Sequence, residues 1–395
     1  MKRRALQSVA AGLVWGVTLG LCDAVQAAQI VAWGSNNYGE LNTPAGNDFL
    51  VLAGGNANGL ALKTDGSLVA WGIASNGEGN VPAGNNFMAI SAGFGHSMAL
   101  RSDGSLVAWG ANHYGQCNAP AGGDFVAVAS GSDHNIALRS DGSLAAWGRN
   151  NWGQANVPEG HDYVAIASGC WHNVALKSDG SLVAWGSNLF GERNVPAGRD
   201  FVAVGAGFHT GLALKSDGSL VAWGMYSNTG QTVPPGDDFV AISGGFCRSM
   251  ALRTDGSVVT WRFNEIGIYV SEEAPGRDYV AIAAGSYTSY ALVAEPAAWA
   301  ALKLRRAVAD KQKALAAIAA ALKNEQAAEG QLEKLQLWGE WKSSDLLAAR
   351  QPIHSAMNHQ QQSSNALRKS LLNLADSLSA LTGDAPPRVP AGGRQ

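Results

Sequence analysis

Short apolar runs, separated by glycine, proline and polar residues, fill residues 28–295. One such stretch reads Phe201-Val-Ala-Val-Gly-Ala-Gly207, then Gly211-Leu-Ala-Leu-Lys215, then Ser219-Leu-Val-Ala-Trp223. Runs of this length, rich in Val and Leu and bounded by turn residues, are typical of β-strands. The last two runs are joined by Ser-Asp-Gly, and its Asp-Gly pair suits a tight hairpin turn. Helical spacing is absent here, so the region is predicted to be all-β.

The same unit recurs along this region. Its tryptophan returns every 38 residues, at Trp33, Trp71, Trp109, Trp147, Trp185, Trp223 and Trp261. Proline, aromatic and glycine positions keep the same step until the last unit, which carries two extra residues. A fixed period of roughly 20–50 residues indicates a solenoid, a propeller or an array. Three to four short antiparallel strands per unit favour a propeller blade.

The two ends of the repeat region hold complementary parts of one unit. The region begins with Gln29–Trp33, which is only a third strand, and ends with Tyr279–Gly285 and Ser289–Val293, a first and a second strand. Pairing these segments completes a seventh blade and removes two exposed sheet edges, which favour aggregation. An open solenoid would instead need polar caps. We therefore expect a seven-bladed β-propeller over residues 28–295, closed by its N-terminal strand.

The pattern changes after Glu295, where glycine nearly disappears and Ala, Leu, Lys, Gln and Glu dominate. Residues 297–336 and 344–382 predict two long helices around a turn near Gly339. The second helix carries a 4-3 alternation typical of a coiled-coil seam, at Leu346, Arg350, Ile353, Met357, Gln360, Ser364, Leu367, Leu371, Leu374, Leu378 and Leu381. We expect an α-helical hairpin over residues 296–383, docked on the propeller or pairing with a second copy. The tail 384–395, rich in Pro and Gly, is expected to be disordered.

Residues 1–27 predict an export signal. Lys2, Arg3 and Arg4 precede an apolar stretch, and Val25-Gln-Ala27 supplies the small residues of a cleavage site. The stretch is short for a membrane span, so we expect a cleaved protein in the periplasm or outside the cell. Lipidation at Cys22 is the alternative, although the preceding Leu21 is bulky for that chemistry.

Charge and cysteine usage narrow the classes of partner. Residues 28–295 carry 12 Lys and Arg against 22 Asp and Glu, a net charge of −10, whereas residues 296–395 carry 13 against 8, a net charge of +5. An acidic repeat region argues against a nucleic-acid partner. The cysteines outside the leader, Cys117, Cys170 and Cys247, have neither the number of a disulfide framework nor the spacing of a zinc site.

The repeated signature resembles the regulator of chromosome condensation repeat family. It reads Ala-Gly-x-x-His-x-x-Ala-Leu-x-x-Asp-Gly-x-Leu-x-x-Trp-Gly-x-Asn-x-x-Gly-Gln from Ala92 to Gln116. The short unit and the export signal make the chain more similar to the bacterial β-lactamase inhibitor protein II branch than to the eukaryotic nuclear exchange factor. That resemblance implies an inhibitory face built from aromatics between the first and second strands. At the middle position of this loop, only Trp171 and Tyr287 are aromatic here, with His209 a partial match.

Residue types that recur in every unit are most simply explained by blade architecture. The seven tryptophans are expected to wedge between blades. Six Asp-Gly pairs are expected to form turns rather than calcium sites, because each offers one isolated carboxylate. His96, His134 and His172 share one repeat position in adjacent units. A metal site would need their nitrogens to converge on one ion, so structural histidines are expected, with a metal as the alternative.

Variable and aromatic positions gather on one predicted face. Strand alternation brings the loops between first and second strands to the same rim as the loops after third strands, opposite the Ser-Asp-Gly turns. The first group of loops holds the candidate partner-binding residues Phe94, His96, Asp133, Trp171, His209, Phe246, Arg248 and Tyr287. The second group holds Tyr38, Tyr114, Trp152 and Phe190, with Tyr226 and Phe263 at equivalent places. Aromatic residues and arginine are enriched in binding hot spots. Alternatively, these rings fill gaps between loops.

The sequence contains no nucleophile elbow, Walker loop, paired-cysteine metal motif or His-Glu-x-x-His. We therefore expect no enzyme, cofactor or metal, but a protein that binds an unidentified protein partner, with inhibitor-like binding as the narrower form of this hypothesis. Aromatics flanked by Asn also suit sugar rings, so lectin-like glycan binding is the second hypothesis. A structural role in the cell envelope is the third hypothesis. Under each of the three hypotheses, we also expect that the C-terminal helices allow self-association of the protein.

Overall fold

The computed structural model describes residues 9–10, 28–225, 233–263, 269–274 and 276–294, together with helical residues 311, 315, 318–323, 326–327, 351, 355–366, 369–370 and 373. The chain divides into two compact units, Met1–Glu295 and Pro296–Gln395. Tyr226, the side chain of Phe263, the turn near Gly339 and the tail 384–395 lie outside the described residues. So does the leader, apart from Val9 and Ala10.

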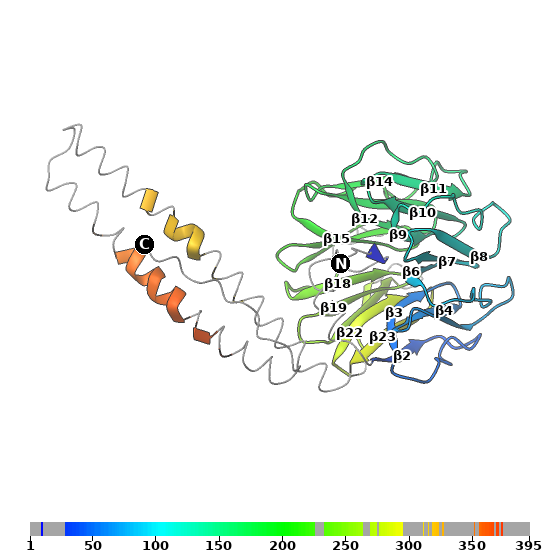
Figure 1. Ribbon diagram of the computed structural model, residues 1–395, viewed down its shortest axis with the longest axis horizontal. Helices are drawn as coiled ribbons and strands as arrows, with labels where there is room; N and C mark the ends of the chain where they lie inside the picture. Colours follow the sequence, from blue (N-terminus) through cyan, green and yellow to red (C-terminus); the bar gives the residue numbers. More distant parts are fainter. Residues whose placement is uncertain are drawn as a thin grey trace. The chain divides into compact units, whose positions relative to one another are not determined.

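The first unit contains seven β-sheets in its described residues (Figure 1). Six of them follow one another along the chain. Their first strands are β3 (Phe49–Gly54), β6 (Phe87–Ala92), β9 (Phe125–Ser130), β12 (Tyr163–Ser168), β15 (Phe201–Ala206) and β18 (Phe239–Gly244). Their second strands are β4 (Asn58–Lys63), β7 (His96–Arg101), β10 (His134–Arg139), β13 (His172–Lys177), β16 (Thr210–Lys215) and β19 (Ser249–Arg253). Their third strands are β5 (Leu68–Gly72), β8 (Leu106–Gly110), β11 (Leu144–Gly148), β14 (Leu182–Gly186), β17 (Leu220–Gly224) and β20 (Val258–Phe263).

The seventh sheet joins the two ends of the repeat region. β22 (Tyr279–Ala284) and β23 (Thr288–Ala294) are its first two strands, and β2 (Ala28–Gly34) is its third. β2 runs antiparallel to β23, in a register that pairs Ala28 with Ala294 and Gly34 with Thr288. The pairing expected between residues 29–33 and 289–293 is therefore present.

Two sheets carry a fourth strand. β21 (Tyr269–Glu273) pairs with β20 and is the outer strand of that sheet. β1 (Val9–Ala10) pairs in parallel with Ala127 and Val128 of β9. Among the described residues, the other sheets have three strands, because their proline- and glycine-rich segments run as loops.

The repeated tryptophans link each blade to the loop of the blade before it. The indole Nε1–H of Trp147 donates to the main-chain oxygen of Gln116 at 3.0 Å, and Trp223 donates to that of Glu192 at 2.8 Å. Trp71, Trp109 and Trp185 make equivalent bonds across the same sequence separation of 31 residues. Since each indole buries a large ring and satisfies its donor, these side chains are scaffold, as the repeat predicted.

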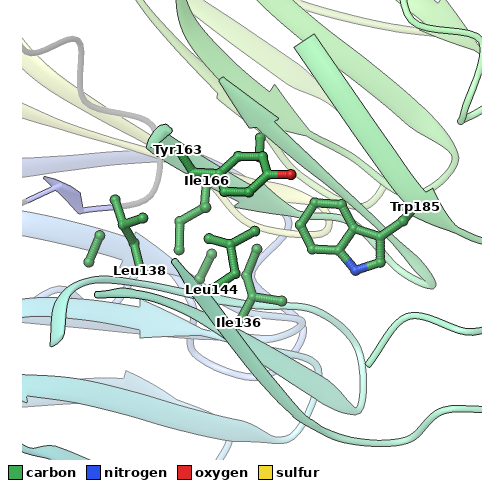
Figure 2. Close-up of a cluster of buried hydrophobic side chains, with 9 residues drawn as sticks. Ile136, Leu138, Leu144, Tyr163, Ile166 and Trp185 are labelled. Atoms are coloured by element: carbon green, nitrogen blue, oxygen red, sulfur yellow. The ribbon is translucent and has the colours of Figure 1, made fainter. Parts of the chain in front are cut away.

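The hydrophobic core lies between neighbouring sheets. In one cluster Ile136 and Leu138 of β10 pack against Ile166 of β12, with Trp185 of β14 at the edge (Figure 2). Equivalent clusters lie between the other pairs of sheets that follow one another along the chain, up to the sheet of β22 and β23. Small residues such as Ala137 and Ala175, both fully buried, let the sheets approach closely. Blade packing therefore depends on repeated Leu, Ile, Val and Ala rather than on one central core.

The Ser-Asp-Gly segments form hairpin turns, as predicted. Asp103 accepts hydrogen bonds from the N–H of Ser105 at 2.9 Å and from its hydroxyl at 2.6 Å. These bonds hold the pKa of Asp103 below its ordinary value. Gly104 follows with a φ of +80°, which glycine adopts without strain. The same side-chain bonds recur at Asp65, Asp141, Asp179, Asp217 and Asp255.

In the second unit, residues 318–323 and 355–366 are helical. Within 355–366, Met357 and Gln360 are half-buried and Ser364 is buried, while Asn358, His359 and Gln362 are exposed. These are the three described members of the predicted seam, which itself stays a prediction. No helical segment of the described residues is long and apolar enough to cross a membrane.

Candidate functional site

A ring of glycines surrounds one mouth of the space between the sheets. Each blade contributes the glycine that follows its first strand, and the members are Gly55, Gly93, Gly131, Gly169, Gly207, Gly245 and Gly285. A methyl group added to Gly131 would lie 2.6 Å from the carbonyl oxygen of Gly169, and one on Gly285 would lie 3.0 Å from that of Gly55. Each glycine touches the next, and the series returns from the last blade to the first. We call these seven residues the glycine collar.

Two of the histidines next to the collar, His96 and His134, are structural. The Nε2 of His96 lies 2.8 Å from the Oδ1 of Asn135, and that of His134 lies 2.9 Å from the Oδ1 of Asn173. Asn135 in turn donates to the main-chain oxygen of Gln116. Each histidine therefore bridges two blades. His96 was predicted as a partner contact, but only 1% of it is exposed, so it supports the face and cannot touch a partner.

Burial governs the protonation of these histidines. Desolvation lowers the pKa of His96, and it lowers the pKa of both His134 and His172 to about 4. The hydrogen bond to Asn173 opposes this shift at His134, but burial dominates. The rings are therefore neutral at neutral pH.

Side-chain hydrogen bonds fix the loops that follow the third strands. The Oδ1 of Asn150 accepts from the N–H of Ala155 at 2.9 Å, and the Oε1 of Gln154 accepts from the N–H of Trp152 at 2.8 Å. The loops that carry Tyr38, Tyr114 and Phe190 have the same pair of bonds. Hydrogen bonds within each loop thus hold the backbone that carries these four aromatics.

Six of the predicted aromatics are exposed on this face. Tyr38 is 59% exposed, Tyr287 52%, Phe94 and Tyr114 each 47%, Phe190 45% and Trp152 42%. Trp171 and Phe246 are half-buried. We call these eight side chains the aromatic rim. Exposed Leu189, in the loop after β14, also lies on this face and was not among the predicted residues.

Part of the rim forms one connected cluster of rings. The ring centroids of Trp152 and Trp171 lie 6.2 Å apart in a stacked arrangement. Trp171 contacts Phe208 at 6.1 Å, Phe208 contacts Phe246 at 3.8 Å, and Phe246 contacts Phe94 at 6.0 Å. Phe208, which was not among the predicted site residues, is the central member. Its signal in the sequence is that Phe94, Phe208 and Phe246 share one repeat position.

His209 and Glu192 form a buried pair beneath this cluster. The Nδ1 of His209 lies 2.7 Å from the Oε1 of Glu192, and both side chains are almost completely enclosed. The His209 ring also lies 4.4 Å from Phe190 and 4.2 Å from Phe208. Burial lowers the pKa of His209, although the bond to Glu192 opposes the shift. The prediction that His209 contacts a partner is therefore corrected, because this side chain is only 4% exposed and positions the rings above it.

The other polar candidates have partners within the face. Asp133 pairs with Arg149 at 3.3 Å, and the Arg149 guanidinium lies 4.8 Å from the centre of the Tyr114 ring. Arg248 is half-buried and donates to the Ser289 hydroxyl at 3.3 Å, so it bridges two blades as the histidines do. Burial lowers its pKa. Arg248 therefore reaches the surface only in part.

Metal binding and thiol chemistry receive no support from this face. The described residues contain no cluster of three or more His, Cys, Asp or Glu side chains able to hold a metal ion. Burial raises the pKa of Cys170 to about 11, so its thiol stays protonated at neutral pH. Burial also raises the pKa of Cys117.

Comparison with known proteins agrees with this architecture. The family model of the regulator of chromosome condensation (RCC1) repeat matches residues 89–116, 125–154 and 163–192. Prp20p from Saccharomyces cerevisiae, whose binding to Gsp1p and histones has been described, superposes with a TM-score of 0.58 at 20% identity, covering 73% of this chain and 97% of that one. Yeast RCC1 (Prp20) bound to Kap60 gives a TM-score of 0.57 at 19% identity, with coverages of 76% and 98%.

Human WBSCR16 is similar at a TM-score of 0.57 and 16% identity, covering 68% of this chain and all of its own. No curated protein matches the chain by sequence. At these identities the structural likeness concerns the fold alone. The described part of residues 28–294 therefore builds a mostly β array of repeated three-strand units, three of which match the RCC1 repeat model, and this array folds like the RCC1 propellers.

Proposed function

We propose that this chain is a non-catalytic binding protein that recognises a protein partner through its aromatic rim. The observation that carries the proposal is the exposure of six aromatic side chains on one face, four of them on loops held by side-chain hydrogen bonds. Rings held in place before binding lose little conformational entropy, and buried aromatics contribute much of the energy at protein interfaces. The protein partners named for Prp20p support binding as a role of this fold, without identifying the partner here.

An inhibitor-like action is the narrower form of this proposal. It rests on the resemblance to the β-lactamase inhibitor protein II branch, in which the same loops act. In this chain the middle loop positions are Ala57, Gly95, Asp133, Trp171, His209, Cys247 and Tyr287. Because most of these are not aromatic, we propose an enzyme other than a β-lactamase as the target of any inhibition.

Export and ring closure complete the proposal. We propose that residues 1–27 are removed during export, which would release β1 from the edge of β9. The pairing of β2 with β23, together with the contact of Gly285 with Gly55, supports closure of the seven sheets into a ring. We further propose that residues 296–383 form a helical hairpin that tethers or oligomerises the protein.

The test compares two variants of the full chain in capture of a partner from the native extracellular or periplasmic fraction. The rim variant carries Trp152→Ala, Trp171→Ala and Tyr287→Ala. Its control carries Val164→Ala and Val202→Ala, two exposed apolar residues of first strands outside the rim loops. We expect the rim variant to lose the partner and the control to keep it. Equal capture by both would contradict the proposal.

A glycan array run on the same proteins addresses the lectin hypothesis. That hypothesis relied on Asn side chains beside the aromatics. The structure uses Asn112 and Asn150 within their own loops, where both donate to another Asn and accept from a backbone N–H. Discrete sugar hits without any captured protein would favour the lectin.

A further inference from the structure

A narrow channel lies between the first strands of the seven sheets. All seven first strands border it, with small side chains such as Ala129, Ser168, Gly205 and Ala284. The first strand lies at one end of its sheet, and each contacts the first strand of the next sheet, with β22 also in contact with β3. The wall of the channel therefore consists of strand edges, which carry main-chain hydrogen-bonding groups.

The edge of β9 offers such groups to the channel. The N–H of Gly131 donates to the main-chain oxygen of His134 at 2.8 Å, which fixes a bonded pair at the end of β9 and β10. Bonded and non-bonded pairs alternate in an antiparallel ladder, so the main-chain groups of Val128 and Ser130 point away from β10. The N–H of Ser130 donates to the Ser91 hydroxyl at 2.9 Å. The groups of Val128 are left for a strand on the channel side.

The amino-terminal strand β1 uses this edge. Val9 lies opposite Ala127 and Ala10 lies opposite Val128, in a parallel register. β1 also contacts β6, the first strand of the preceding sheet (Figure 1). Among the described strands, no other first strand has a partner on this side. One extended segment of the chain thus lies against the wall of the channel.

The direction of β1 is set by the two ends of the channel. At the collar, main-chain hydrogen bonds join the blades, as from Ser132 to Cys170 and from Cys170 to Phe208, each at 3.3 Å. β9 begins at the other end, where the N–H of Phe125 donates to the main-chain oxygen of Gly104 in a Ser-Asp-Gly turn. Because β1 runs parallel to β9, its amino-terminal end points toward these turns.

Carboxylates outnumber cations at parts of the turn face. Lys63 pairs with Asp48 at 2.9 Å, and it also attracts Asp65, which has no ion pair of its own within the described residues. The same arrangement of two carboxylates around one cation recurs at Lys215, Asp200 and Asp217. Residues 2–4, which precede β1, are one Lys and two Arg. Opposite charges therefore favour the approach of this segment from the turn face.

We propose that the channel is a binding site for one short extended peptide, which adds to the inner edge of β9 as a parallel strand. Its occupant is the amino-terminal segment of this chain, in which basic residues precede the apolar residues around Val9 and Ala10. The site is filled in a chain that keeps residues 1–27, and it is open once they are removed. This inference goes beyond the proposed function, because it uses no residue of the aromatic rim.

The test measures binding of a fluorescent peptide of residues 1–14 to the chain that begins at Ala28 and keeps all seven sheets. Three matched peptides carry Val9→Thr, Val9→Pro, or Lys2→Glu with Arg3→Glu and Arg4→Glu. Proline removes a main-chain donor that threonine keeps. By fluorescence anisotropy, we expect the Thr peptide to bind within about threefold of the native peptide, and the Pro and Glu peptides to bind at least about tenfold more weakly.

Two further measurements place the peptide in the channel. A chain that keeps residues 1–27 should bind the fluorescent peptide at least about tenfold more weakly, because its own segment competes at a high effective concentration. Residue-resolved hydrogen exchange should show that the peptide slows the amide of Val128 at least about tenfold. Val204 is the matched control, since it has the equivalent place in β15 and its amide should not change.

Four results would overturn the inference. They are equal binding of the Thr and Pro peptides, full affinity of the chain that keeps residues 1–27, unchanged exchange at Val128, and no binding up to about 1 mM. None of them depends on capture of a partner by the aromatic rim. The outcome is therefore separate from that of the proposed function.

Discussion

His134 and His172 are completely enclosed between neighbouring blades and hold their neutral form. The pKa of each is about 4 in the folded chain, against an ordinary value of 6.5. Between these two values the unfolded chain binds more protons than the folded one. Stability therefore falls as the pH drops through this window, and it is constant with respect to these groups above 6.5.

We predict a loss of at most about 3 kcal/mol per histidine between pH 7 and pH 4, since each pKa unit corresponds to about 1.4 kcal/mol. Urea unfolding at a series of pH values measures it. The matched variant is His172→Asn, because Asn58 occupies that position in another blade. Its stability should depend less on pH between 4 and 6.5, and an undiminished slope would show that His172 is not the source.

The His209–Glu192 pair gives a second prediction at this scale. His209→Ala leaves the buried Glu192 carboxylate without its ring partner and should reduce the free energy of unfolding by about 3 kcal/mol. Glu192→Gln introduces the uncharged residue that Gln116 and Gln154 supply at the equivalent repeat position. The double variant His209→Ala, Glu192→Gln should therefore recover most of the lost free energy of unfolding. Chemical denaturation of the single and double variants is the measurement. Additive effects of the two substitutions would contradict the coupling.

At the scale of the element, the first strand and its glycine decide how closely two blades approach. The glycine of the collar is needed for space, since a methyl group on Gly131 would meet the carbonyl oxygen of Gly169 and the ring of His134. Within strand β15, Gly205 has a different environment. The nearest atoms to a methyl group there lie 3.6 Å away, an ordinary contact distance.

We therefore predict opposite results for two glycine substitutions. Gly131→Ala should lower the free energy of unfolding by about 1–3 kcal/mol through overpacking. Gly205→Ala should be neutral or stabilising by up to about 1 kcal/mol, because it restricts the unfolded chain. Equivalent strands already carry Ala129 and Ala167 at that position. Thermal or urea unfolding of both variants measures these changes. Equal losses of the free energy of unfolding in the two variants would show that the collar glycines are not packed more tightly than Gly205.

The elements themselves could be predicted from the sequence, because a strict repeat shows each strand and turn several times. The packing role of the repeated tryptophans and the Asp-Gly turns could be predicted from the same repeat. Burial of the single side chains could not be predicted: His96 lies two residues after exposed Phe94 and His209 lies next to half-buried Phe208, and only packing against the neighbouring blade encloses the histidines. The ring cluster around Phe208 was missed for the same reason, since its contacts join residues from different blades.

At the scale of the whole molecule, export is a prediction of its own. If residues 1–27 are removed, the secreted protein should begin at Ala28, the first residue of β2. Ala28 is fully buried and its N–H donates to the main-chain oxygen of Asn47, so this end is already held in the fold. Intact-mass measurement of the protein recovered from the medium or periplasm tests it. A retained leader or a lipid mass at Cys22 would contradict it.

The shared rim depends on closure of the seven sheets, because only a closed ring brings loops from the first and last blades to one mouth. Hydrogen exchange of the folded protein, followed by mass spectrometry, measures closure most directly. We predict that amides of residues 28–34 exchange as slowly as those of 288–294 and of strands β3 to β5, since β2 pairs with β23 along its length. Rapid exchange in 28–34 beside slow exchange in 288–294 would mean that the ring is open.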